Sequence, residues 1–594
     1  MDRPEVVLID SESVVEQYNL LGRIAQDSVV AIDTEGDYFQ NKYDPVRGES
    51  GFESWNGKMG CFSVACGSLP NHAFVAPLDD SPAPWQLLSA LDAREGPTWA
   101  WNWKHDGWQL SVRQQADAMI LAWILSRRAP GKHPFGLKAQ SAHFLGYELT
   151  EQDWDSGVPV EERCKDPAFL RYAAEDAWAC MHLAIQGLAG LEAEEAALRR
   201  WVWDVEFPFV EVLAHMERRG LPLDGSVLRE IAAGMEREHT DVAWDWSLRW
   251  PETSIASPKA LSEKFYGEGL WSTDGIPLLK SGYYQTDEAA LLRHAAAGGE
   301  GGEAAALKLR YQDLHKNIET YLKPMCGFAE GSSDLRLHCQ LKQMGTETGR
   351  LSSARPNLQN IPKHSEMGKR IRAAVVQPEG RLFVSADYSQ IELRVLAHFA
   401  GDGVLADAYR SGADIHQRTA DLLGCSRQAA KTINFAKIYG SGPAKQAALI
   451  GCTMREASIF MQRYEAAYPE VLRVVQRAVD AARRNGRIRT ISRRFRPLPS
   501  INAADRKLRG GDERRAGNTP IQGSAADIVK KAMVAAHKAS LPMCLQIHDD
   551  IMLDVEWDEA ADAQATLCRI MEGAWELRVP LKAESKIGQS WAEV

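Results

Sequence analysis

The sequence has no hydrophobic run of the roughly 18 residues that a membrane-spanning helix requires, so it predicts no such helix. Its first residues, MDRPEVVLID, carry acids where a secretory signal has an apolar core. Only ten of the 594 residues are cysteine and none form a CxxC pair, which argues against a disulfide framework and a zinc knuckle. No internal repeat or long low-complexity tract is present. These absences predict a multidomain, cytoplasmic protein, with roughly three to five domains at ~100–200 residues each.

Charge is unevenly distributed along the chain. Residues 1–200 hold 17 lysines and arginines against 30 acids, although the net charge of the whole chain is only −11. Residues 481–531 hold 14 basic residues against 4 acidic ones. An acidic first part and a local basic stripe suggest a polyanion that is bound by one region. A solvated charged face is the alternative that charge alone leaves open.

Periodicity gives a coarse outline of the elements. It predicts a strand over 28–32, a helix over 116–125 and one long amphipathic helix over 188–220 that links two domains. The stretch AAAGGEGGEAAA at 295–306 predicts a flexible surface loop, and a helical run follows over 303–323.

Acidic residues end the first of these strands. Side chains alternate along a strand, so Asp33 and Glu35 in VVAIDTE point to the same face. Two carboxylates on one face repel each other unless a divalent cation lies between them. On helices, Asn102 would share a face with Asp106, and Tyr172 with Asp176.

A second set of acids lies in the C-terminal half. The apolar strand 381–387 ends in Asp387, and the alternating pattern over 545–555 predicts a hairpin around Asp549 and Asp550. Adjacent acids at a hairpin tip, opposite a strand-end acid, suit magnesium and phosphoryl transfer. A simple polar turn is the alternative for the isolated His-Asp-Asp tripeptide.

A four-residue repeat occurs in RQAAKTINFAKIYG. Arg427, Lys431, Phe435 and Tyr439 drift by only about 40° per step and therefore lie along one helix face. Two cations followed by two aromatics can hold phosphates at one end and stack a base at the other.

These patterns resemble two known families. DYSQIELR, RxxxKxxxFxxxYG and HDD resemble motifs A, B and C of family A DNA polymerases, as do TGRLSSARPNLQNIP, ADIHQRTA and NTPIQGSAADIVKKAM. The N-terminal acids resemble the three motifs of DnaQ-like 3′→5′ exonucleases. The resemblance implies an α/β multidomain fold, with an RNase H-like exonuclease domain followed by a right-hand polymerase. Its palm would be an antiparallel sheet, and its fingers and thumb would be helical.

The resemblance also places domains along the chain. It implies an exonuclease domain over 1–195, a linker helix and thumb over 196–345, palm over 346–393 and 511–594, and fingers over 394–510. It implies a DNA-templated DNA polymerase with proofreading. Because little precedes the exonuclease motifs, no 5′-nuclease domain is expected, which favours the replicative polymerase of a bacteriophage.

Residue roles follow from the matched motifs alone. The resemblance assigns magnesium, two ions per site with manganese as a substitute, to Asp387 and Asp549 in the palm and to Asp33, Glu35, Asp106 and Asp176 in the exonuclease. It gives Asp550 and Tyr172 supporting catalytic roles, the latter in orienting a water. It implies that the incoming nucleotide contacts Arg427, Lys431, Phe435, Tyr439, Glu392, His416 and Gln390, with Lys431 also protonating the leaving group. It implies that DNA contacts Arg350, Asn357, Gln359, Arg514, Asn518, Gln522 and His548.

Three positions depart from the family pattern. Asp550 stands where glutamate is usual, Ala436 where glycine is usual, and His105 where an aromatic is usual. Primer–template DNA and dNTPs are the implied partners, with a phage helicase, primase and single-strand binding protein as further candidates, no membrane, and a monomeric state.

Three alternatives stay open. The first is a bacterial or organellar repair polymerase of the same family. The second is a non-catalytic DNA-binding subunit with a polymerase fold, which the matching carboxylates disfavour. The third is an exonuclease with a decayed polymerase half, which the intact stripe from Arg427 to Tyr439 disfavours.

Overall fold

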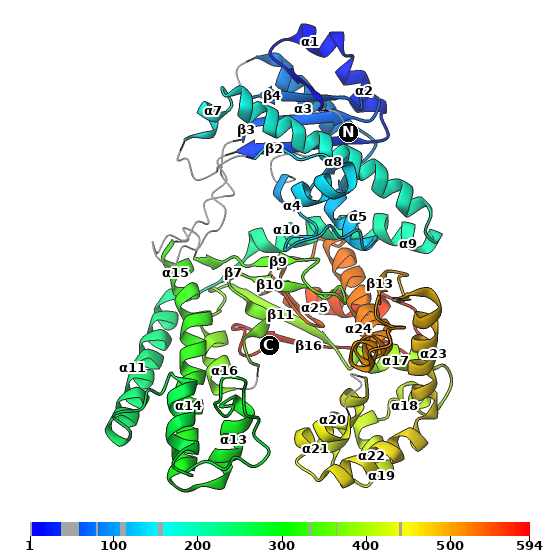
Figure 1. Cartoon of the computed structure of the whole chain (residues 1–594). Coiled ribbons are helices and arrows are strands. Elements are labelled where there is room, and N and C mark those ends of the chain that lie inside the picture. Colours follow the sequence, from blue (N-terminus) through cyan, green and yellow to red (C-terminus); the bar gives the residue numbers. More distant parts are fainter. Residues whose placement is uncertain are drawn as a thin grey trace.

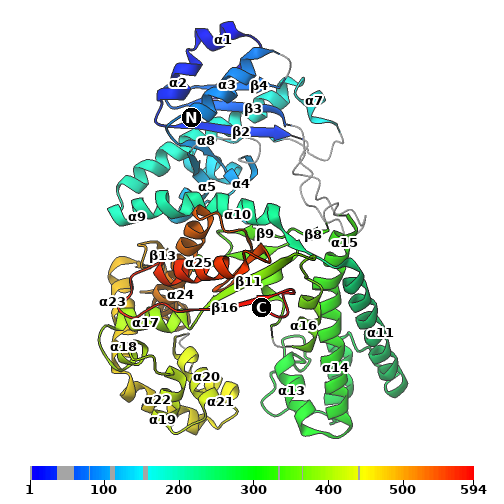
Figure 2. The same cartoon turned by 180° about the vertical axis from the view of Figure 1, so that it is seen from behind.

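A computed structural model describes residues 3–36, 59–78, 81–106, 114–151, 158–331, 335–363, 365–438 and 442–594. An N-terminal domain sits above a four-stranded sheet, and two helical arms extend from the sheet on opposite sides (Figures 1 and 2). Among the described helices, none is both long and apolar enough to cross a bilayer.

The N-terminal domain is built on a six-stranded mixed sheet with the order β1-β4-β3-β2-β5-β6. Its strands are β1 (Glu5–Leu8), β2 (Val30–Gly36), β3 (Met59–Cys66), β4 (His72–Pro77), β5 (Thr98–Ala100) and β6 (Gln115–Asp117). Its helices are α1 (Glu12–Gln17), α2 (Leu20–Gln26), α3 (Pro82–Ala93), α4 (Trp103–Asp106), α5 (Ala118–Ile124), α6 (Leu137–Gln140), a π-helical turn (Ser141–Leu145), α7 (Val160–Arg163), α8 (Pro167–Glu192) and α9 (Ala196–Trp201).

Helix α8 packs across β2, β3 and β4. It is lined with small buried residues such as Ala173, Ala177 and Ala184, which let the helix approach the sheet closely. Seven of the eight residues of β3 are buried, as expected for a strand covered on both faces. The helix therefore brings its own side chains over the end of β2, where the predicted acids lie.

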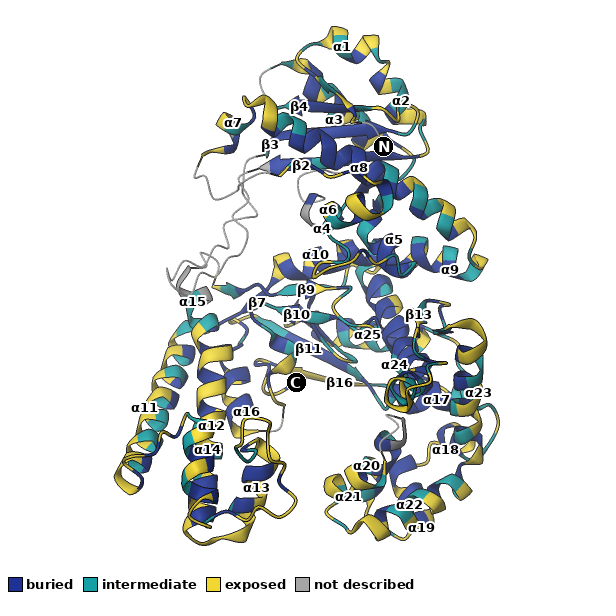
Figure 3. Ribbon diagram, in the orientation of Figure 1, coloured by how far each residue is buried: buried dark blue, intermediate teal, exposed yellow. Residues whose placement is uncertain are grey.

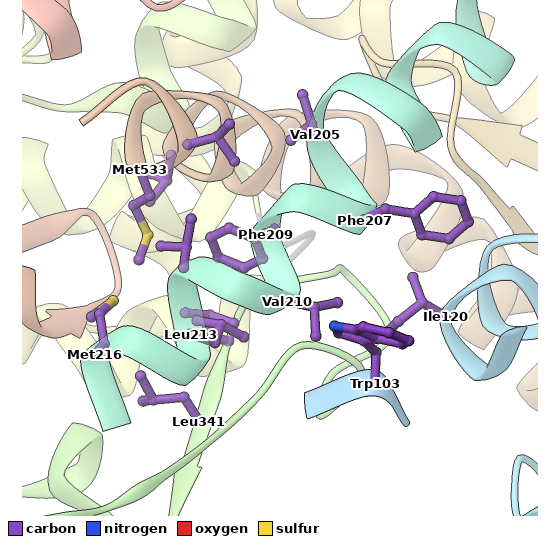
Figure 4. Packing of buried hydrophobic residues seen from close by; sticks show 14 of the residues in the cluster. Trp103, Ile120, Val205, Phe207, Phe209, Val210, Leu213, Met216, Leu341 and Met533 are labelled. Carbon is purple, nitrogen blue, oxygen red and sulfur yellow. The ribbon is translucent and has the colours of Figure 1, made fainter. Parts of the chain in front are cut away.

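A π-helical turn (Val202–Glu206) and α10 (Phe207–Arg219) connect this domain to the rest. Apolar side chains project from several sides of α10. Figure 4 shows Trp103 and Ile120 of the N-terminal domain against one side, and Met533 near another. The connection is thus a buried joint, and its packing fixes the N-terminal domain against the sheet below.

A buried ionic network reinforces this joint. Glu206, at the end of the π-helical turn, accepts a hydrogen bond from the Lys530 ammonium at 2.9 Å and lies 3.5 Å from Arg494. Arg494 in turn donates to Asp527 at 2.7 Å. Burial alone would raise the pKa of Glu206, but Lys530 and Arg494 hold it below its ordinary value. Charges paired in this way are costly to separate, because each would be left buried without a partner.

The first arm, predicted as the thumb, is helical. It contains α11 (Gly225–Arg249), α12 (Pro258–Leu261), a π-helical turn (Ser262–Tyr266), α13 (Glu288–Ala297), α14 (Gly299–Asn317), a π-helical turn (Ile318–Leu322) and α15 (Lys323–Gly331). Its outward faces are largely exposed, whereas α24 and the sheet below the N-terminal domain are largely buried (Figure 3).

The palm is an antiparallel sheet of order β14-β15-β11-β16. Its elements are β11 (Arg381–Tyr388), α17 (Ile391–Ala400), α24 (Arg506–Lys538, with Pro520 inside), β14 (Met543–Ile547), β15 (Asp550–Glu556), α25 (Ala560–Gly573) and β16 (Ala583–Gly588). Short elements precede them: β7 (Leu221–Pro222), β8 (Arg336–Leu337), β9 (Gln340–Lys342), β10 (Ser352–Ala354), a 3-10 turn (Leu358–Asn360) and α16 (Glu366–Ala373). The register opposes Asp387 to Asp550, so both lie at one end of the sheet.

The second arm, predicted as the fingers, is also helical. It contains α18 (Val404–Arg410), α19 (Ile415–Leu423), α20 (Arg427–Ile438), α21 (Pro443–Ile450), α22 (Met454–Ala467), α23 (Pro469–Asn485) and the hairpin β12 (Arg487–Arg489) and β13 (Phe495–Pro497). In both views α20 and α21 lie on the side of this arm that faces the other arm (Figures 1 and 2). Two predicted domain boundaries fall inside helices: 393/394 within α17 and 510/511 within α24.

The predicted loop over 295–306 is wrong. Helix α13 ends at Ala297 and α14 begins at Gly299. Gly298, with a φ of 71°, separates the two helices. Gly301 is buried, and its carbonyl accepts a hydrogen bond from the Trp271 indole at 2.7 Å. A Cβ at Gly301 would lie 2.2 Å from the Leu270 carbonyl oxygen. Glycine is present for close packing rather than for flexibility.

Three other predicted elements need correction. The helix over 188–220 is interrupted after Glu192, where Glu194 binds Arg487 of the second arm. The helix over 116–125 begins as strand β6 and becomes α5 only after Asp117, which caps it. Asn102 lies outside α4 with a φ of 70°, so it does not share a helix face with Asp106.

Candidate active sites

The N-terminal candidate site joins β2 to α8. Asp33 and Glu35 lie two residues apart on β2, and Asp176 lies on α8 where that helix crosses the strand. One carboxylate oxygen of each residue lies within 4.8 Å of the others. The predicted shared face of Asp33 and Glu35 is therefore present, and α8 supplies the third acid.

Two of these three acids are buried, and Asp33 is half-buried. Glu35 is 4% exposed and Asp176 is 8% exposed. Burial, followed by repulsion from Glu35, raises the pKa of Asp33 well above its usual range. Burial raises the pKa of Asp176 to about 7, although Lys138 opposes the shift. Like charges this close require protons or cations between them.

Two oxygens of this cluster are left without hydrogen bonds. Asp33 Oδ2 and Asp176 Oδ1 are buried and have no hydrogen-bond partner. Buried carboxylate oxygens that lack donors are the ligands that hard divalent cations prefer. The residues present therefore fit the magnesium ions that the sequence predicts here.

The remaining predicted members surround the cluster. Asp106 ends α4 and is buried, and its Oδ1 accepts hydrogen bonds from the backbone and hydroxyl of Thr34 at 3.2 and 2.9 Å. Its charge also raises the pKa of Asp33. The Tyr172 hydroxyl, one helical turn from Asp176, hydrogen-bonds that carboxylate. The side chain of His105 lies outside the described part of the chain.

One residue near this cluster was not predicted. The Lys138 ammonium lies 5.8 Å from the centre of the Tyr172 ring and lowers the pKa of Asp176. Lys138 belongs to α6, and no motif distinguishes it from other lysines in the sequence. Only the folded chain shows that it supplies a positive charge beside three acids.

The second candidate site lies at the end of the palm sheet. Asp387 is near the end of β11, Asp549 lies in the turn after β14, and Asp550 begins β15. The Tyr388 backbone N–H donates to the Asp549 carbonyl at 3.2 Å, which closes the turn onto β11. The predicted hairpin and its position opposite Asp387 are both present.

Electrostatics at this sheet edge resemble those of the first site. Burial, followed by the charges of Asp549 and Asp550, raises the pKa of Asp387 to about 7. Burial raises the pKa of Asp549 to about 6, while the positive charge of Arg350 opposes the shift. Asp387 Oδ1 is buried without a hydrogen-bond partner, so this site also fits a divalent cation.

Asp550 differs from its neighbour in how it is held. The hydroxyl of Ser385, on β11, donates a hydrogen bond to Asp550 Oδ1. One oxygen of Asp550 is thus engaged by the protein, whereas Asp387 keeps a buried oxygen without a partner. Ser385 was not predicted; it lies within the apolar strand before Asp387 and carries no recognisable pattern.

A small cavity brings together several predicted residues of the palm. Arg350, His548 and Asp549 line it, together with Gln546, Lys530 and Met533. Arg350 also forms an ion pair with Glu392 of α17. A predicted DNA contact and a predicted nucleotide contact are therefore bound directly to each other. Gln390, just before α17, accepts a hydrogen bond from the Tyr409 hydroxyl at 2.8 Å.

Helix α20 presents the predicted stripe. Arg427 is exposed and donates to Asp414 at 2.8 Å, Lys431 is exposed, and Phe435 is half-buried. Tyr439, the fourth member of the stripe, lies outside the described residues.

His416 is buried beside this stripe. Its ring centre lies 6.0 Å from that of Phe435, and its Nδ1 is 3.0 Å from the amide nitrogen of Asn434. Asn434 was not predicted, although it precedes Phe435 on the same helix and fixes the imidazole.

The remaining predicted DNA contacts lie on two segments. Arg514, Asn518 and Gln522 are spaced by four on α24 and share a face, and Asn518 Oδ1 is buried without a hydrogen-bond partner. Around β10, Asn357 accepts from the Ser353 hydroxyl at 3.0 Å, and the Gln359 amide donates to the Gln546 carbonyl at 3.1 Å. The second segment is thereby attached to β14, next to Asp549.

Comparison with known proteins identifies a family and several relatives of this chain. A model of the family described as DNA polymerase family A matches residues 227–593. DNA polymerase I of Pseudomonas aeruginosa is 36% identical over 513 residues, which cover 80% of this chain and 53% of that protein. The thermostable DNA polymerase I of Thermus filiformis is 37% identical over 408 residues, which cover 66% of this chain and 48% of that protein. The chain spans about half the length of these curated relatives.

A solved structure has the same fold. The POL domain of Pol1 from M. smegmatis, in complex with DNA primer-template and dNTP, superposes with a TM-score of 0.82 and 24% sequence identity. The match covers 99% of this chain and 100% of that one, so it includes both the N-terminal domain and the arms.

Proposed function

Since the chain belongs to DNA polymerase family A, we propose that it extends a DNA primer with dNTPs on a template strand and removes mismatched 3′ nucleotides at a second site. The observation that carries the polymerase activity is the convergence of Asp387 and Asp549 at one end of the palm sheet. The resemblance stated above and the polymerase relatives support the same activity.

Asp387 and Asp549 are the residues that would hold magnesium, with manganese as a substitute. When bound, the ions lower the cost of charge that develops on the attacking and leaving oxygens. Asp550 is a positioning residue in this proposal, because Ser385 already occupies one of its oxygens. It would hold Asp387 and its surroundings through water or through β11 rather than by a direct metal bond.

The residues around α20 would bind the incoming dNTP. Arg427 and Lys431 offer exposed cations for the triphosphate, and Lys431 would protonate the leaving pyrophosphate. Phe435 would stack on the nucleotide, and Tyr439 is expected to do so too. His416 is held by Asn434 so that its other ring nitrogen can face the phosphates.

Glu392 and Gln390 would act on the sugar side of the nucleotide. The buried Glu392 carboxylate is fixed by Arg350, so it can fill the space that a 2′-hydroxyl would need. The Gln390 carbonyl is fixed by the Tyr409 hydroxyl. Rigid polar groups at this position favour deoxyribonucleotides, because a ribose would displace a paired charge.

The duplex would contact α24 and the segment at 350–359. Arg350, Asn357, Gln359, Arg514, Asn518, Gln522 and His548 are the residues proposed for this contact. Acceptors in the minor groove are shared by all base pairs, so donors placed there check geometry and not sequence. The basic residues of 481–531 would add salt-sensitive contacts to the backbone.

The N-terminal cluster is proposed as the proofreading site. Asp33, Glu35 and Asp176 would hold two magnesium ions, with Asp106 fixed by Thr34 at the edge of the cluster. The Tyr172 hydroxyl would orient the attacking water, because it is already hydrogen-bonded to Asp176. The buried oxygens of Asp33 and Asp176 that lack partners support this assignment.

A primer-extension assay tests both activities. With magnesium and four dNTPs, we expect extension of a matched primer, and excision followed by extension of a primer with a mismatched 3′ end. A phosphorothioate linkage at the mismatched end, which resists excision, serves as the control. Extension without excision would contradict the proofreading site. Excision without extension would contradict the polymerase site.

Two biological roles are compatible with this proposal. A replicative polymerase of a bacteriophage and a bacterial repair polymerase would differ in product length per binding event. On a long primed single strand with excess unlabelled competitor DNA, the replicative role predicts products of full length. Products of a few tens of nucleotides would favour repair instead.

A further inference from the structure

Three metal-ligating side chains meet on the surface of the joint between the domains. Glu211 and His215 lie one turn apart on α10, and His537 lies near the end of α24. Each histidine Nε2 is 3.7 Å from Glu211 Oε1. The two imidazole ring centres are 4.9 Å apart, and one ligand atom of each residue lies within 4.8 Å of the others.

This spacing is close to that of a zinc site. Zinc bonds of about 2.0–2.1 Å in a tetrahedral arrangement place ligand atoms roughly 3.3 Å from one another. The two 3.7 Å separations would need to shorten by only a few tenths of an ångström, which side-chain rotation supplies. The backbones are already fixed, because α10 packs on α24 and Glu206 pairs with Lys530, two helical turns from His537 along α24.

The ligand types also suit a zinc ion. Imidazole nitrogens and carboxylate oxygens are both common zinc ligands, and two histidines with one glutamate leave a fourth position open.

We propose that Glu211, His215 and His537 bind one Zn²⁺ ion, with water in the fourth position, and that this ion ties α10 to α24. Two imidazole ligands favour zinc over magnesium, in contrast to the all-carboxylate clusters of the two candidate active sites. The site lies outside both clusters, so it does not depend on the proposed function. Its effect is to strengthen the joint that holds the N-terminal domain on the palm.

Zinc binding by the purified full-length chain tests this site. Calorimetric titration with Zn²⁺ is carried out in excess Mg²⁺, which occupies the carboxylate clusters equally in all variants. We expect His537→Gln and Glu211→Gln each to bind one Zn²⁺ fewer per chain than wild type. His133→Gln, which removes an exposed imidazole elsewhere, is the matched control and should bind as wild type does.

A second readout separates a site from a change in folding. Zn²⁺ should raise the thermal midpoint of wild type and of His133→Gln, but not that of His537→Gln. Circular dichroism without zinc checks that the variants are folded. Unchanged stoichiometry in His537→Gln and Glu211→Gln would overturn the proposal. Loss of the same ion in His133→Gln would overturn it as well.

Discussion

The two carboxylate clusters differ in how deeply they lie. Glu35 and Asp176 are buried and only Asp33 is half-buried, whereas Asp387, Asp549 and Asp550 are all half-buried at a sheet edge. Lys138 lowers the pKa of Asp176 in the first cluster, whereas in the second Arg350 lowers the pKa of Asp549 and Lys363 lowers that of Asp387. The two clusters therefore contain similar acids but differ in burial and in the basic residues nearby.

This difference affects how the repulsion between carboxylates is offset in each cluster. In the palm, water and Arg350 screen the acids, and Arg350 itself is tied to Glu392. In the N-terminal domain two of the three acids are buried, and Asp33 Oδ2 and Asp176 Oδ1 lack hydrogen-bond partners. The buried cluster therefore depends more strongly on bound cations for its stability.

The largest expected effect tests whether the clusters act separately. Asp33→Ala combined with Glu35→Ala should abolish excision of a mismatched 3′ nucleotide and leave extension of a matched primer near wild type. Asp549→Ala should do the reverse, with extension reduced to background, because each change removes ligands from only one cluster. Gel assays of both reactions on one preparation measure this. Loss of both activities in either variant would contradict the separation.

The next effect concerns the joint between the two regions. Glu206→Ala should lower the free energy of unfolding by about 3–5 kcal/mol, because Lys530 is left buried without its partner. Urea unfolding followed by tryptophan fluorescence measures the loss.

A matched double variant controls for the loss of volume at this joint. Glu206→Leu combined with Lys530→Met removes both charges and should recover much of the stability. If Glu206→Ala unfolds like wild type, the ionic network does not stabilise the joint.

A smaller effect distinguishes the two acids of the hairpin tip. Asp550→Ala should retain activity, with a loss on the order of 10–100-fold, as is typical when a residue behind a metal ligand is removed. Asp550→Glu should be tolerated, and Ser385→Ala should cost less than Asp550→Ala because it frees one oxygen of the carboxylate but does not remove it. Single-turnover incorporation at saturating magnesium is the measurement. An Asp550→Ala variant as inactive as Asp549→Ala would make Asp550 a direct ligand.

The smallest effect tests the dependence of the buried cluster on cations. In chelator, Asp33→Asn should raise the thermal midpoint of the protein, because it removes one of three carboxylates that repel one another. Magnesium should then stabilise wild type more than the variant. Asp387→Asn is the matched control in the palm and should change the metal-free midpoint less. Equal changes in both variants would contradict the proposed difference between the clusters.

Sequence patterns predicted the parts of both clusters that depend on local order. Asp33 and Glu35 share a face because strands alternate, and the hairpin around Asp549 follows from an alternating run with polar residues at its tip. The stripe on α20 is correct as far as Phe435. In each case a single element determines the relation between the residues.

Contacts between distant segments could not be predicted in this way. No sequence motif marks the residues that support the predicted ones. The fold alone places Lys138 near Asp176, Ser385 against Asp550 and Asn434 against His416. The glycine-rich composition around Gly301 predicted a loop. Composition does not show that Leu270 and Trp271 pack against this glycine in the folded chain. The metal-ligating group at Glu211 was missed because its third member is more than 300 residues away.

Helix α24 has a consequence for how this chain can change in evolution. Its 33 residues span about 50 Å, and residues at different positions along it make different contacts. Arg514, Asn518 and Gln522 lie before three residues that hold other elements. Asp527 binds the second arm, Lys530 binds the π-helical turn before α10, and His537 lies against α10. Inserting one residue between Gln522 and Asp527 would turn one set by about 100° relative to the other. Point substitutions along α24 can therefore accumulate one at a time, whereas a single-codon insertion or deletion there moves the residues proposed to contact the duplex relative to the domain joint at once.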